Sequence, residues 1–183
     1  ARPDLYGCLE GAQEGAQTAE EARLVHLVLG KFRQAGATLP SPEERDGASA
    51  LDARSAALAF QIEQNINEDC TEVELGEGEL AGLGRDFVES LPAVGGGAGA
   101  RRCSIKAPVL APIMQRGTCS EARRKLLGAS QRRCMDANGP LLDELLAVRH
   151  RAAKALGFSS HAERMLSTKM AQTVPSAEGF CSE

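Results

Sequence analysis

Apolar residues recur every three or four positions in the first part of the chain, the spacing that places them on one face of a helix. Residues 18–34 show this pattern, and Thr18 with Glu21 forms a capping box at their start. Residues 41–67 predict a second, longer helix that opens on Ser41. The apolar stripe of that helix is Leu51, Ser55, Leu58, Ile62 and Ile66.

The pattern changes at Cys70, because apolar and charged residues alternate from there to Leu75, as in a half-exposed strand. Helical turns are expected over 79–83 and 85–91. Residues 103–114 predict a second strand, which two prolines confine to a sheet edge or interrupt. We expect the two strands to pair as a hairpin around the Gly-rich loop at 92–100. No Lys-Ser/Thr follows this loop, so it is interpreted as a flexible linker and not as a phosphate site.

Helical periodicity returns over the last third of the chain. Thr118 is predicted to cap a helix to about 133, and Asn138-Gly-Pro140 to open another that Gly157 closes. Ser160 with Glu163 caps a helix to about 171, and a last helix opens at Pro175.

The predicted fold class is therefore mainly α, a helical bundle-like array with a small two-stranded β insertion around residues 70–114. Residues 1–17 are weakly patterned and are expected to be a poorly ordered lead-in. Residues 18–183 are predicted to form a single mainly helical domain. With no Trp, one Tyr and five Phe, its core must consist mostly of Ala and Leu, which favours packing of helix on helix.

Charge is distributed unevenly: residues 1–100 carry −11 and residues 101–170 carry +9. The basic half lacks aromatic residues for base stacking and any recognition motif, so nucleic-acid binding is not expected. Arg123-Arg124-Lys125 and Arg132-Arg133 lie on one predicted helix. They form either a solvated basic face or the partner of an acidic surface, for which residues 63–89 of the same chain are a candidate.

The six cysteines form no C-x-x-C pair, and their spacing fits neither a zinc ribbon nor a compact disulfide scaffold. We expect free thiols in a reducing compartment. No apolar run approaches the roughly 20 residues that a membrane helix needs. The chain begins with Ala1 and not with Met, so we expect its true N-terminus to lie outside this sequence.

Candidate catalytic and metal-ligating residues are few. The chain has three histidines, His26, His150 and His161, and none belongs to an H-E-x-x-H motif. We expect them to cap helices or to pack against other residues. The polar run Asn65, Asn67, Glu68 and Asp69 is interpreted as structural, because adjacent carboxylates point about 100° apart on a helix. No catalytic, metal or cofactor-binding residue is assigned.

Several motifs occur in an order that resembles the thimet oligopeptidase and oligopeptidase A family of zinc metallopeptidases. Residues 60–69, FQIEQNINED, resemble its F-x4-N-[LI]-N-E-D signature, and residues 79–91 resemble its E-L-x-G-L-P-x-D-F-x3-L element. Residues 149–171 resemble the helical region upstream of its zinc site. The signature residues that the resemblance assigns a structural part are Asn65, Asn67, Glu68, Asp69, Gly157 and His161.

The resemblance implies a helical wall of a deep peptide channel, with the zinc ligands and the catalytic Glu downstream of this chain. We therefore expect a fragment of a peptidase that hydrolyses short peptides with zinc, inactive when isolated, whose partner is the remainder of that peptidase. Neither nucleic acid nor membrane is an expected partner. An intracellular, cytoplasmic location is expected, and an organellar one stays open. The alternative is a free-standing, non-catalytic helical interaction module derived from that family.

Overall fold

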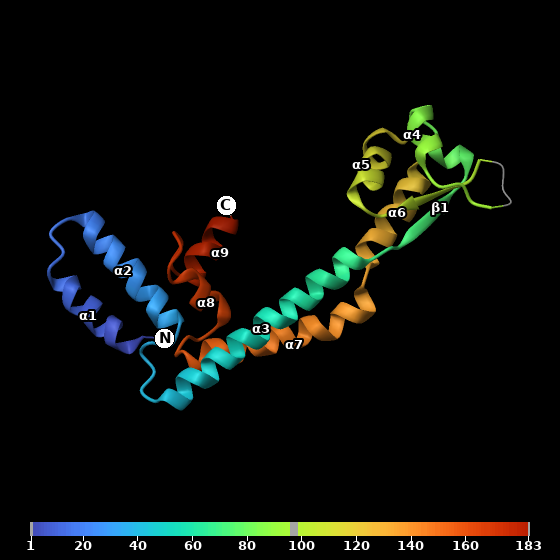
Figure 1. The fold of residues 1–183 in the computed structure, drawn as a ribbon. Coiled ribbons are helices and arrows are strands. Elements are labelled where there is room, and N and C mark those ends of the chain that lie inside the picture. Colours follow the sequence, from blue (N-terminus) through green and yellow to red (C-terminus); the bar gives the residue numbers. More distant parts are fainter. Residues whose placement is uncertain (1, 96–98, 183) are drawn as a thin grey trace. The chain divides into compact units, whose positions relative to one another are not determined.

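A computed structural model describes residues 2–95 and 99–182 of the chain. These residues form nine α-helices, one 3-10 helix and one two-stranded antiparallel sheet (Figure 1), so the mainly-α prediction is confirmed. In chain order the elements are α1 (Pro3–Glu14), α2 (Ala19–Gln34), α3 (Pro42–Glu68), β1 (Glu72–Leu75), the 3-10 helix η1 (Glu77–Leu80), α4 (Arg85–Ser90), β2 (Arg101–Ser104), α5 (Ala107–Arg116), α6 (Ser120–Arg132), α7 (Met135–Ala155), α8 (His161–Leu166) and α9 (Val174–Ser182).

The chain divides into two compact units, where the sequence predicted one domain over 18–183. The first unit contains residues 2–61 and 140–182, and the second contains Ile62–Gly139. The second unit has a hydrophobic core of its own, which explains why it separates. The fully or almost fully buried residues of that core are Leu75, Leu80, Leu91, Cys103, Ile105, Ile113, Ala122 and Leu126.

The sheet of the second unit pairs β1 with β2 in antiparallel register, with Val73 opposite Cys103. The predicted second strand was too long, since β2 ends at Ser104 and residues 107–116 are helical. Pro108 lies in the first turn of α5, where a missing N–H costs nothing, and Pro112 removes only one bond from the helix.

The Gly-rich loop predicted at 92–100 continues the hairpin at both of its ends. The backbone amide of Val94 donates to the Ala100 carbonyl (3.1 Å), and that of Arg102 donates to the Pro92 carbonyl (2.8 Å). Residues 96–98 of the predicted linker lie outside the described residues.

The segment predicted as a poorly ordered lead-in contains helix α1 in the first unit. Pro3 occupies the first turn, and Tyr6 is buried against Leu29 and Ala37. Arg33 Nε donates a hydrogen bond to the Tyr6 hydroxyl (2.9 Å). These contacts come from α2 and the turn after it, so the local pattern of residues 1–17 could not reveal them.

Most helix ends follow the predicted caps. Thr18 and Glu21 form the reciprocal capping box of α2, and the Ser41 hydroxyl accepts from the Glu44 amide (3.1 Å) at the start of α3. Gly157 has the left-handed φ of +84°, and the Phe158 amide donates to the Ala153 carbonyl (3.0 Å), which closes α7.

Three predicted boundaries were wrong. The N-cap of α6 is Cys119, whereas the Thr118 hydroxyl donates to the Ala81 carbonyl (3.0 Å). Helix α7 begins at Met135 and contains Pro140. Helix α8 ends at Leu166, because the carbonyl that would continue it, that of Arg164, accepts bonds from the side chains of Gln34 (2.7 Å) and Ser167 (2.8 Å).

Candidate functional site

The polar run singled out in the sequence lies where α3 ends, and it connects that end to α7. Asn65 Nδ2 donates to Asn138 Oδ1 (2.7 Å), and Asn138 Nδ2 donates to the Ile62 carbonyl (3.3 Å). The Cys134 thiol donates to the Asn65 carbonyl (3.2 Å) and to Asp69 Oδ2 (3.3 Å). Sequence reasoning missed Cys134 and Asn138, and no local signal marks either one.

The electrostatics of this cluster favour a neutral thiol beside a carboxylate. Hydrogen bonds from the Thr71 amide and hydroxyl, and then from Cys134, lower the pKa of Asp69. Burial, followed by the hydrogen bond to Asp69 and the charge of Asp69, raises the pKa of Cys134. Because a thiolate is the reactive form of cysteine, this thiol is suited to hydrogen bonding and not to nucleophilic attack.

The other two members of the run do not join the cluster. Glu68 is exposed and its Oε1 accepts from Gln64 Nε2 (2.7 Å), four residues earlier on the same helix. Asn67 is exposed, and its backbone carbonyl accepts from Lys106 Nζ (3.3 Å). Glu68 and Asp69 therefore form no acid–base pair.

His161 begins α8, directly after the capping residue Ser160, whose hydroxyl accepts from the Glu163 amide (3.1 Å). The Nδ1 atom of His161 is buried and has no hydrogen-bond partner among the described residues. Burial, followed by the charges of Arg149 and Arg164, lowers its pKa, so the neutral imidazole is favoured. Across residues 2–95 and 99–182, no three His, Cys, Asp or Glu side chains gather closely enough to hold a metal ion.

A bidentate ion pair beside His161 was not predicted. The guanidinium of Arg164, which is 11% exposed, places Nη1 and Nη2 each 2.7 Å from a carboxylate oxygen of Asp52 on α3. Nη2 also donates to the Gln34 carbonyl (2.8 Å). One arginine thus connects α8, α3 and the end of α2 within the first unit.

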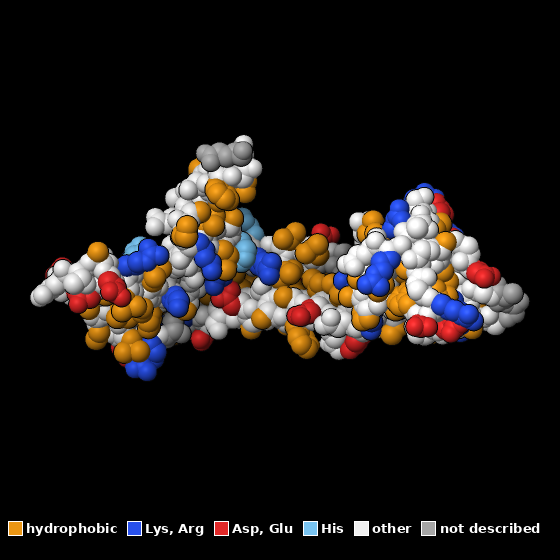
Figure 2. Space-filling model, turned by 90° about the horizontal axis from the view of Figure 1, so that it is seen from above, with side chains coloured by type: hydrophobic (Ala, Val, Ile, Leu, Met, Phe, Trp, Pro, Cys, Tyr) orange, Lys and Arg blue, Asp and Glu red, His pale blue; other side chains and the backbone are white. Residues whose placement is uncertain are grey.

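The basic face of α6 meets part of the acidic segment proposed for it. Lys125 Nζ lies 2.6 Å from Glu79 Oε1, and this pairing is the main cause that lowers the pKa of Glu79. Arg124 pairs with Glu121 on its own helix at 2.9 Å. On the face shown in Figure 2, Lys and Arg side chains lie among acidic and hydrophobic ones and form no continuous basic surface.

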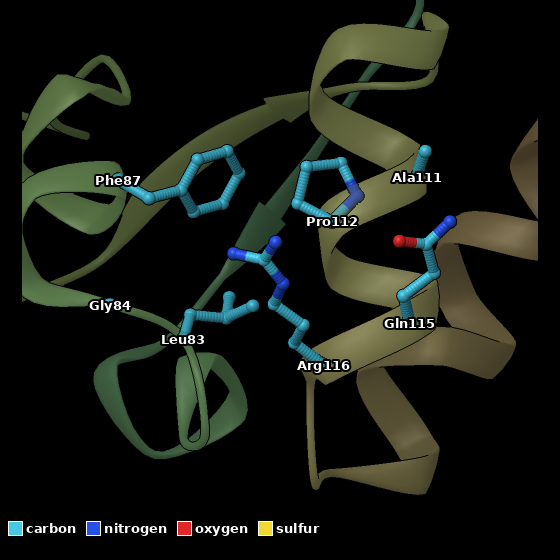
Figure 3. A pocket seen from close by; sticks show the side chains of 7 residues that line it. All are labelled: Leu83, Gly84, Phe87, Ala111, Pro112, Gln115 and Arg116. Atoms are coloured by element: carbon cyan, nitrogen blue, oxygen red, sulfur yellow. The ribbon is translucent and has the colours of Figure 1, made fainter.

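A pocket of about 220 Å³ lies between α4 and α5 in the second unit. Its walls are mostly apolar, and Figure 3 shows the Arg116 guanidinium crossing it between Leu83, Phe87 and Pro112. The remaining residues of its lining are Gly84, Ala111 and Gln115. No motif in the sequence indicated this pocket.

Comparison with known proteins places these features in context. Residues 113–183 match the model of the family described as "Peptidase family M3". The thimet-like oligopeptidase of Dictyostelium discoideum is 26% identical over 168 residues, which cover 92% of this chain and 25% of that protein. Oligopeptidase PhomG of Diaporthe leptostromiformis is 29% identical over 155 residues (84% and 22%), and oligopeptidase A of Salmonella typhimurium is 28% identical over 185 aligned positions (92% and 25%).

These similarities confirm the resemblance to the thimet oligopeptidase and oligopeptidase A family. The chain spans about a quarter of the length of the curated relatives it matches. None of the helices in the described part of the chain combines the length and apolar character that crossing a bilayer requires.

Proposed function

We propose that this chain is the helical, channel-wall part of a longer zinc-dependent oligopeptidase that hydrolyses short peptides. The observation that carries the proposal is the extent of the similarity. It follows 84–92% of this chain and only 22–25% of the three oligopeptidases reported above. In this account the zinc ligands and the catalytic Glu belong to the part of the protein that this sequence does not include.

The contacts of the family-signature residues support a scaffolding role for this chain. Asn65 and Asp69 are hydrogen-bonded to the turn and helix that follow α6, and Gly157 supplies the left-handed residue that ends α7. The three histidines of the sequence occur in no H-E-x-x-H motif. We propose that the isolated 183 residues hydrolyse no peptide.

The principal partner in this account is the remainder of the same peptidase. Several large apolar side chains of the first unit are exposed, including Phe60 (67%), Phe180 (82%) and Met170 (95%). Met170 and Phe180 line one mostly apolar pocket, and a contiguous exposed apolar surface is usual where another part of a protein packs. We further propose a cytoplasmic location for the whole protein, because the spacing of its six cysteines fits no disulfide scaffold.

Sequencing of the mature transcript beyond the codon for Glu183 tests this proposal. We expect an open reading frame that continues to an H-E-x-x-H motif, whose two histidines bind zinc while its glutamate activates water. A stop codon directly after Glu183 would contradict the proposal. That result would favour the free-standing helical interaction module instead.

A further inference from the structure

The pocket between α4 and α5 combines an apolar wall with one positive charge. Leu83 and Phe87 lie on one side and Pro112 on the other, and Arg116 is the charged residue among the described residues of its lining (Figure 3). Gly84, Gln115 and Arg116 of the lining are exposed, so the pocket is open to a ligand from solvent.

Arg116 has no charge partner among the described residues, and it is exposed. None of the ion pairs within residues 2–95 and 99–182 includes it, and its guanidinium makes no hydrogen bond there. Two basic residues at the start of α6 do have partners: Arg123 bonds the Gly117 carbonyl, and Arg124 pairs with Glu121. A planar guanidinium beside apolar surface favours a carboxylate, which it can bind through two parallel hydrogen bonds.

We propose that this pocket binds the C-terminal residue of a short peptide. The terminal carboxylate pairs with Arg116, and an apolar side chain lies beside that guanidinium, against the apolar wall of Leu83, Phe87 and Pro112. A pocket of about 220 Å³ holds a single residue. Only a C-terminal residue carries a carboxylate and an apolar side chain on the same Cα, so an internal Asp or Glu does not satisfy both features at once.

The proposal rests on the proposed function only in taking short peptides as the ligands. All residues of the proposed binding site lie within this chain. Titration of the ¹⁵N-labelled 183-residue chain with acetyl-Ala-Leu, followed by amide chemical shifts, measures it directly. We expect saturable shifts within residues 83–87 and 111–116, and about tenfold weaker binding of acetyl-Ala-Leu-amide, which lacks the carboxylate.

Arg116→Gln should weaken binding of the free acid by about tenfold and abolish the preference for acid over amide. Arg132→Gln is the matched control, since Arg132 is likewise the exposed last residue of a helix and lies outside the pocket, and it should bind as the parent chain does. Unchanged spectra away from the pocket verify that each variant folds.

Equal binding of acid and amide, parent-like binding by Arg116→Gln, or no shifts at millimolar peptide would each overturn the pocket assignment. Equally tight binding of acetyl-Glu-amide would do so too, because it would show a site for any carboxylate. None of these outcomes bears on the proposed function, which the reading frame beyond Glu183 decides.

Discussion

Single residues connect helices that are far apart in the sequence. Asn138 is the centre of the cluster in the second unit, because its side chain accepts from Asn65 and donates to the Ile62 carbonyl. Removal of that side chain takes away both of these hydrogen bonds. Such a loss typically costs about 1–2 kcal/mol.

Asn138→Ala should therefore lower the free energy of unfolding by about 1 kcal/mol, after the small gain in helix propensity that alanine brings. Asn67→Ala is the matched control, since Asn67 is exposed on α3 and its side chain makes no hydrogen bond within the described residues. Urea unfolding followed by circular dichroism measures both variants. Equal stability of the two would show that the Asn65–Asn138 bond contributes nothing.

Cys103 is fully buried in β2, and burial, followed by the charges of Glu72 and Glu79, raises its pKa from 9.0 to about 11. Between those values the unfolded chain releases the thiol proton before the folded chain does. Stability should therefore fall as the pH rises from 9 toward 11.

Alkylation at pH 8, read by mass spectrometry, should label the exposed Cys8 and Cys70 while Cys103 stays unmodified. Labelling of all three at one rate would contradict the burial of Cys103.

Which residues the sequence could identify depended on whether their partners were local. The Lys125–Glu79 contact was predictable in outline, because a basic helix and an acidic segment are visible as charge runs. Cys134 and Asn138 were not, since their partners lie 65 to 76 positions away. Arg116 carries no local signal, because the pocket that it enters exists only once α4 and α5 are folded.

At the scale of elements, the left-handed backbone conformation at the end of α7 favours glycine, which is Gly157. Gly157→Ala should cost about 1 kcal/mol of unfolding free energy, since a side chain disfavours the left-handed region. Gly47→Ala is the control with the opposite sign: Gly47 lies in the second turn of α3, where nothing lies within 4 Å of an added Cβ, and the variant should gain about 0.5–1 kcal/mol. Thermal unfolding of both variants checks the opposite signs, and stabilisation by Gly157→Ala would contradict this helix end.

The attachment of α8 depends on Arg164. Arg164→Met keeps much of the side-chain volume, but it removes the bonds to Asp52 and to the Gln34 carbonyl, so we expect a loss of about 2 kcal/mol. Arg164→Lys should rescue little, because an ammonium cannot reproduce the bidentate geometry. Hydrogen exchange of the α8 amides reads this attachment directly. Unchanged protection in Arg164→Met would show that α8 packs without the ion pair.

Element boundaries were predictable where a local cap determines them and not where tertiary contacts do. Thr18, Ser41 and Gly157 act at the predicted ends. The two prolines of α5 suggested an interrupted strand, because proline is tolerated both at sheet edges and in the first turn of a helix. The early end of α8 follows from Gln34, a residue 130 positions away, and no local pattern contains that information.

At the scale of the whole molecule, the order of motifs carried more information than any single residue. The family resemblance inferred from those motifs is confirmed by the comparisons, and so is the mainly-α fold. The division into two units was not predicted, because α3 and α7 are continuous helices that each contribute residues to both units. A sequence pattern that follows helices does not show where a second core begins.

We propose that this chain supplies scaffold to a zinc peptidase and no catalytic group. Hydrolysis of an internally quenched fluorescent peptide by the purified 183 residues, with and without added zinc, distinguishes scaffold from catalyst. We expect no turnover above buffer in either condition, and no stoichiometric zinc in the purified protein. Zinc-dependent turnover that copurifies with the chain and disappears with chelator would contradict it.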